Sequence, residues 1–100
     1  MSLPVTFVLE VLAGCRLMHC GGLVATRCPL HEDQDPSLTI WDTPKGQKAG
    51  CWPCGKSGDV IDWLRYICPS LGFAAAVDFG LECVESMKRS GWVGPRIEAS

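Results

Sequence analysis

The chain has 100 residues, of which 47% are hydrophobic, with a formal net charge of −2 and a pI near 5.5. This length suits one small domain with a thin core, and the slightly acidic charge argues against a strong nucleic-acid binder. No apolar run is long enough to cross a membrane, and the first residues lack the basic region of a signal peptide. We therefore expect a globular, cytoplasmic protein without a membrane partner, whose seven cysteines stay reduced or bind metal.

The N-terminal segment has the pattern of an amphipathic helix that ends at Gly14. Four apolar residues recur there at helical spacing, namely Val5, Val8, Leu9 and Leu12. Two strand-like runs follow at residues 16–19 and 23–27, and Gly21-Gly22 between them predicts a hairpin turn. The second run leads the chain directly into a cysteine motif.

The cysteine motif has two halves, Cys28-Pro-Leu-His31 and Cys51-Trp-Pro-Cys54-Gly55, which together read C-x2-H-x19-C-x2-C. Each pair can turn both side chains toward one ion, and three thiolates with one imidazole complete the tetrahedral coordination of Zn²⁺. The four predicted ligands are Cys28, His31, Cys51 and Cys54. Because they leave no position for water, we expect one structural zinc ion. A redox dithiol at Cys51 and Cys54 is the alternative, but it gives the other two ligands no role.

The segment between the two halves predicts a β-hairpin, since residues 38–41 alternate like a strand and residues 48–52 return as its partner. Residues 42–47 are rich in turn formers and predict the connection. After the second half, Asp59 is the expected N-cap of a helix over residues 60–67.

A last helix is expected to start after Ser70 as its cap and to continue to about Arg89, with Gly80 as a weak point. The predicted fold is therefore α+β, a small zinc ribbon of antiparallel hairpins flanked by an N-terminal helix and one or two C-terminal helices. We expect the domain to cover residues 1–88, with the ribbon core at about 23–67. Residues 89–100 are expected to form a flexible tail.

Four linked motifs follow each other in this order: Cys28-Pro-Leu-His31, Asp35-Pro-Ser-Leu38, Cys51-Trp-Pro-Cys54-Gly55 and Gly58-Asp-Val-Ile-Asp-Trp63. Over about residues 5–81 the chain resembles the zinc-binding domain of bacterial and phage DNA primases. That family reads roughly C-P-x-H, T-P-S-F, C-F-x-C-G and G-D-x-I-x-F, and residues 73–77 are similar to its F-x-E-A-V segment.

The resemblance implies a role in DNA replication, as part of a primosome. It implies a module that recognises the single-stranded template and helps a separate TOPRIM-type catalytic domain or subunit to start an RNA primer. This sequence has no such catalytic part, so we expect it to be inactive alone, either as an excised domain or as a small natural protein. A helicase is a further partner that the resemblance implies. The loop Glu32-Asp-Gln-Asp35 is acidic where the family commonly carries a lysine, which predicts weak DNA binding.

Basic residues near the ribbon, together with one tryptophan, are the candidate contacts to single-stranded DNA. They are Arg27, Trp41, Lys45, Lys48 and Lys56. The alternative is that the lysines are ordinary solvated residues and that the tryptophan is a partly buried cover on the hairpin. Trp52 and Trp63 are expected in the core.

The remaining cysteines, Cys15, Cys20, Cys68 and Cys83, are expected to be buried thiols. A second metal site from Cys15, His19 and Cys20 is an alternative, but adjacent residues on a strand point to opposite faces. The acidic balance also leaves open a second function. In that case the ribbon docks a replication or transcription partner without touching DNA, and its binding depends little on salt.

Overall fold

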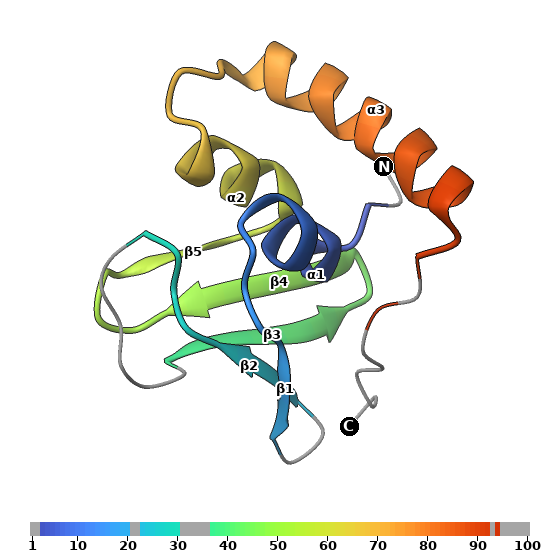
Figure 1. The fold of residues 1–100 in the computed structure, drawn as a ribbon. Helices are drawn as coiled ribbons and strands as arrows, with labels where there is room; N and C mark the ends of the chain where they lie inside the picture. Colours follow the sequence, from blue (N-terminus) through green and yellow to red (C-terminus); the bar gives the residue numbers. More distant parts are fainter. Residues whose placement is uncertain (1–2, 21–22, 31–36, 93, 95–100) are drawn as a thin grey trace.

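The computed structural model describes residues 3–20, 23–30, 37–92 and 94, apart from the side chain of Cys20. Five strands form one antiparallel sheet in chain order, and the helices lie on one side of it (Figure 1). The strands are β1 (Met18–Cys20), β2 (Leu23–Thr26), β3 (Leu38–Thr43), β4 (Gly46–Cys51) and β5 (Lys56–Gly58). The helices are α1 (Val5–Phe7), which continues as a π-helical segment (Val8–Leu12), α2 (Val60–Ile67) and α3 (Phe73–Ser90). The predicted α+β zinc-ribbon architecture is confirmed. Among the described residues, no helix is long and apolar enough to span a membrane.

The N-terminal helix forms where it was predicted, but its second half has π-helical bonding. The amide of Ala13 donates to the carbonyl of Val8 over 3.1 Å, which spans five residues instead of four. This wider turn takes later side chains out of the 3.6-residue period. Leu12, which was predicted on the buried face, is therefore 39% exposed, while Val8 and Leu9 are fully buried.

The β3–β4 hairpin is longer than its sequence predicted. Pairing continues to Thr43 opposite Gly46, so only two residues form the turn. The Thr43 hydroxyl accepts from the Lys45 amide over 3.2 Å and donates to the Gly46 carbonyl, and Gly46 has a φ of 115°. Residue types that favour turns can thus occupy strand ends when a side chain and a glycine close the turn locally. The turn of the β1–β2 hairpin, at residues 21–22, lies outside the described residues.

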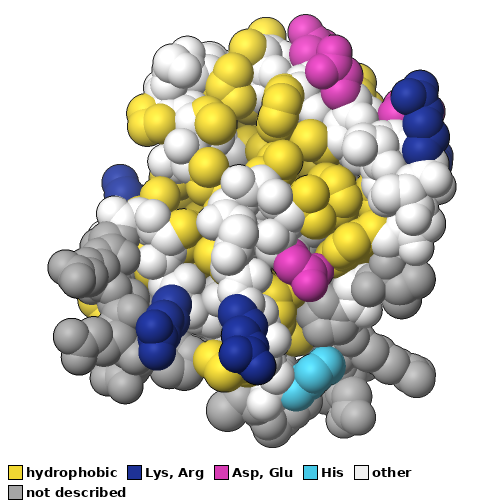
Figure 2. Space-filling view, in the orientation of Figure 1, with side chains coloured by type: hydrophobic (Ala, Val, Ile, Leu, Met, Phe, Trp, Pro, Cys, Tyr) yellow, Lys and Arg dark blue, Asp and Glu magenta, His cyan; other side chains and the backbone are white. Residues whose placement is uncertain are grey.

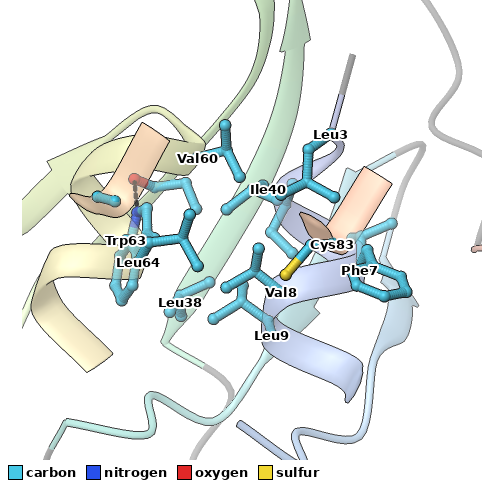
Figure 3. Packing of buried hydrophobic residues seen from close by; sticks show 14 of the residues in the cluster. Leu3, Phe7, Val8, Leu9, Leu38, Ile40, Val60, Trp63, Leu64 and Cys83 are labelled. Atoms are coloured by element: carbon cyan, nitrogen blue, oxygen red, sulfur yellow. Dashed lines mark hydrogen bonds between the residues drawn. The ribbon is translucent and has the colours of Figure 1, made fainter. Parts of the chain in front are cut away.

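The core lies between the sheet and the helices (Figure 3). Trp63 of α2 is fully buried, and its indole N–H donates to the Ala49 carbonyl of β4 over 2.9 Å. This bond satisfies the only polar atom of the largest core side chain, and it fixes α2 on the sheet. The helix starts as predicted, because Asp59 and Asp62 each accept the other's backbone N–H in a capping box.

Helix α3 begins later than predicted and ends within one residue of its predicted end. It begins after Gly72 and has no side-chain cap, so the assignment of Ser70 as N-cap is wrong. It passes through Gly80 without a break and ends at Ser90, followed by Gly91 in the left-handed conformation. The helix thus enters the predicted tail, and Trp92 beyond it contacts the N-terminal helix. Residues 93 and 95–100 lie outside the described part.

Candidate metal centre

Three cysteines meet at one end of the sheet, and their sulfur atoms all lie within 4.8 Å of one another. They are Cys28, Cys51 and Cys54. The Sγ atoms of Cys28 and Cys54 are 3.7 Å apart. Tetrahedral coordination with Zn–S bonds of about 2.3 Å separates two sulfurs by about 3.8 Å. The thiol cluster therefore has the spacing of a zinc thiolate site.

Strand register brings these cysteines together from distant parts of the sequence. Thr26 pairs with Leu38, which pairs with Cys51 on its other side, so the end of β2 and the end of β4 coincide. Cys28 lies two residues beyond the end of β2. The loop between β4 and β5 closes when Gly55, with a φ of 65°, donates its amide to the Trp52 carbonyl over 3.3 Å. That turn brings Cys54 back to the other two sulfurs.

The pKa values of two thiols in the cluster, Cys28 and Cys54, are shifted in opposite directions. Burial raises the pKa of the Cys28 thiol to about 12, and the neighbouring thiols add to this rise. Partial burial acts to raise the pKa of Cys54 as well, but the Lys56 amide and the other thiols outweigh it and lower that pKa. The Ser37 hydroxyl lies 3.8 Å from Cys51 Sγ. Because only thiolates bind zinc tightly, the ion must displace the Cys28 proton, and binding strengthens as pH rises.

The predicted fourth ligand, His31, lies outside the described residues, so its place on the ion stays a prediction. In the described part of the chain, the three cysteines are the only group of at least three side chains that could hold a metal. Cys15, Cys68 and Cys83 are free thiols, of which only Cys83 is buried, so the expectation of buried thiols holds for one of these three. The side chain of Cys20 lies outside the described part.

A five-stranded sheet with a thiol cluster at its end defines a small zinc-ribbon domain. Residues 8–88 match the family model of the CHC2 zinc finger, the zinc ribbon of DnaG. The chain therefore belongs to the CHC2 zinc finger family of DnaG-type primases. No curated protein and no solved structure gives a significant match.

The face of the sheet away from the helices contains a groove of about 330 Å³. Its walls come from β3, β4, β5 and the loop between the two cysteines, and include Thr39, Trp41, Gly50, Trp52, Lys56 and Ser57. Trp41 lies over Gly50, where an added Cβ would come within 3.3 Å of the indole ring. The absence of a side chain at Gly50 therefore gives the indole its place in the groove.

Trp52 was predicted in the core, and that prediction is wrong, because 89% of its surface is exposed. It stands in the loop between Cys51 and Cys54, which turns those two sulfurs inward and leaves the residue between them outside. Its position inside the ligand pair was the signal that could have placed it on the surface. Trp63, in contrast, is buried as predicted.

The structure brings together three of the five predicted DNA contacts. Trp41 and Lys48 are directly opposed on β3 and β4, so their side chains share the groove face. Lys56 lines the groove, with its ammonium 5.2 Å from the ring centre of Tyr66. Lys45 lies in the turn at the other end of the hairpin, and Arg27 is exposed after β2, so neither lines the groove.

Proposed function

We propose that this chain is the template-recognition module of a DNA primase and that it binds single-stranded DNA with the open face of its sheet. One structural zinc ion, held by Cys28, His31, Cys51 and Cys54, maintains the ribbon. The module assists RNA primer synthesis by a separate TOPRIM-type catalytic domain or subunit. Membership of the CHC2 family supports the primase part of this proposal.

The groove beside the thiol cluster is the observation that carries the DNA-binding part. Two indoles, Trp41 and Trp52, line this groove together with Lys56, and Lys48 lies beside Trp41 on the same face of the sheet. Aromatic rings that stack on bases, beside cations that contact phosphates, are the usual means of binding single strands without reading sequence. The exposed indole of Trp52 adds little to the stability of the fold. A ligand that stacks on this ring explains why a tryptophan stands here.

The zinc ion supports the groove indirectly. Cys51 lines the groove itself, and Trp52 and Gly55 belong to the loop that the sulfurs of Cys51 and Cys54 hold closed. Loss of the metal would therefore displace one wall of the groove. With few cations on this face and a net charge of −2, the module alone binds weakly, and the catalytic partner supplies further contacts.

The test is fluorescence anisotropy of a labelled, mixed-sequence single-stranded oligonucleotide with the zinc-loaded protein. Trp52→Ala should weaken binding by about tenfold, because loss of one stacked base costs 1–3 kcal/mol. Lys48→Ala should weaken binding. It should also reduce the slope of log affinity against log salt concentration by about one, because one phosphate contact is lost. Lys88→Ala, at an exposed residue of α3, is the control and should bind like the unchanged protein.

Equal affinity of the Trp52→Ala, Lys48→Ala and Lys88→Ala proteins would contradict binding by the groove. The primase part is tested separately, by adding the protein to a TOPRIM-type catalytic subunit from the same source and measuring primer synthesis. Priming that is the same with and without the zinc-loaded module would refute that part.

A further inference from the structure

Helix α3 carries an exposed apolar stripe beside the face that packs on the core. Phe73 is 65% exposed and Leu81 is 51% exposed, with the half-buried Val77 midway between them. Residues four apart lie above one another on a helix, so these three side chains form one stripe. The face packed on the rest of the molecule is made by other residues, Ala76, Gly80, Cys83 and Val84.

Three carboxylates run along one edge of this stripe. Asp78, Glu82 and Glu85 are all exposed, and their spacing of four and three places them on one line of the helix. Figure 2 shows acidic side chains beside hydrophobic ones over α3, at the top of the view. Lys88 and Arg89 follow in the last turn, where cations complement the helix dipole. The stripe thus has an acidic border along its C-terminal half, beside Val77 and Leu81.

This charge pattern disfavours a second copy of the chain as the occupant of the stripe. If two copies packed their α3 helices antiparallel, the acidic edge of one helix would face the acidic edge of the other. Like charges that face each other across an interface oppose association, and the net charge of −2 adds to the effect. The stripe fits a partner of the opposite charge.

We propose that α3 docks an amphipathic helix of another protein whose apolar face is bordered by lysine and arginine. The apolar residues of the partner would cover Phe73, Val77 and Leu81, and its cations would pair with Asp78, Glu82 and Glu85. This surface is on the helix side of the sheet, whereas the groove is on the open side. A partner on α3 therefore leaves the groove accessible, and the proposal does not depend on DNA binding.

The test uses a synthetic, labelled helical peptide with leucines at helical spacing and lysines beside them, and a matched peptide with glutamates in place of the lysines. Anisotropy with the zinc-loaded protein should show binding of the lysine peptide and at least tenfold weaker binding of the glutamate peptide. Leu81→Ser should weaken lysine-peptide binding by about tenfold, the effect of one apolar anchor in an interface. Glu82→Lys should reduce the preference for the lysine peptide by a similar factor.

Two matched variants control for non-specific hydrophobic binding and for the change in net charge. Leu23→Ser removes another exposed leucine, on β2, and Asp42→Lys makes the same charge change on β3. Both should bind the lysine peptide as the unchanged protein does. The proposal is overturned if these controls lose as much binding as the α3 variants. It is also overturned if sedimentation shows a dimer that Leu81→Ser dissociates, since the occupant would then be a second copy.

Discussion

At the scale of single residues, the thiols of the cluster explain how metal binding and folding depend on each other. Cys28 and Cys51 are only 3% exposed, and a buried thiolate is costly unless a cation compensates it. Burial already raises the pKa of Cys28, so without metal this thiol keeps a proton that zinc must displace. Zinc then acts as a cross-link between β2, β4 and the loop before β5. The free energy of zinc binding therefore becomes free energy of folding for this end of the sheet.

We predict that Cys51→Ser abolishes zinc binding and unfolds the ribbon, because serine is a poor zinc ligand and leaves a buried hydroxyl beside the remaining thiols. Zinc content by native mass spectrometry and thermal melting by circular dichroism measure the two effects. Cys68→Ser, at a half-buried thiol outside the cluster, should keep both zinc and fold. If the Cys51→Ser protein contained no zinc and still melted at the same temperature as the zinc-loaded unchanged protein, the cluster would be dispensable for folding.

At the scale of elements, the junction between β5 and α2 depends on a missing side chain. Gly58 has a φ of 152°, and a Cβ there would overlap the carboxylate of Asp62. That carboxylate accepts the Asp59 amide over 3.1 Å and forms half of the capping box. The glycine therefore lets the cap close, and the cap sets the direction in which α2 carries Trp63 onto the sheet.

We predict that Gly58→Ala lowers the free energy of unfolding by about 2–4 kcal/mol, since it combines a strained backbone with loss of the cap. Gly91→Ala is the control, because Gly91 has a φ of 66° but no atom near an added Cβ. Gly91→Ala should lower the free energy of unfolding by only about 1–2 kcal/mol, which is the cost of placing alanine in the left-handed conformation. Chemical denaturation of both variants measures the difference, and equal losses would mean that the overlap with Asp62 is relieved at no cost.

At the scale of the whole molecule, Trp92 links the two ends of the described chain. Its ring meets Phe7 edge-on at a centroid distance of 5.3 Å, and its indole N–H donates to the Glu10 carboxylate over 3.0 Å. The left-handed Gly91 turns the chain back after α3, and the Trp92 amide donates to the Met87 carbonyl. The N-terminal helix is thereby held from both sides, by the sheet and by Trp92.

We predict that Trp92→Ala lowers the free energy of unfolding by about 1–3 kcal/mol through loss of the ring contact and the hydrogen bond. Trp52→Ala removes the same side chain at an exposed site and should change stability by less than about 0.5 kcal/mol. Urea denaturation of the two variants tests this contrast. If both variants lost the same stability, the Trp92 contact would have no role in holding the ends together.

Features that depend on near neighbours along the chain could be predicted from the amino-acid sequence. Ligand pairs separated by two residues, the Asp59 cap and the apolar face with Trp63 all arise within a few residues, where backbone geometry leaves few choices. Three of the four predicted zinc ligands meet in the structure for this reason, together with the register of β2, β3 and β4.

Which side chains are covered, and which distant segments contact each other, depends on how the whole chain packs. The exposure of Trp52 follows from the direction in which the loop between Cys51 and Cys54 turns, and the exposure of Leu12 follows from a π-helical bond. The contact of Trp92 with Phe7 joins residues that are far apart in sequence. Burial is a sum over all elements packed around a residue, so a local pattern alone does not specify it at positions such as these. The groove and the stripe on α3 depend on that sum, and they became visible only in the folded chain.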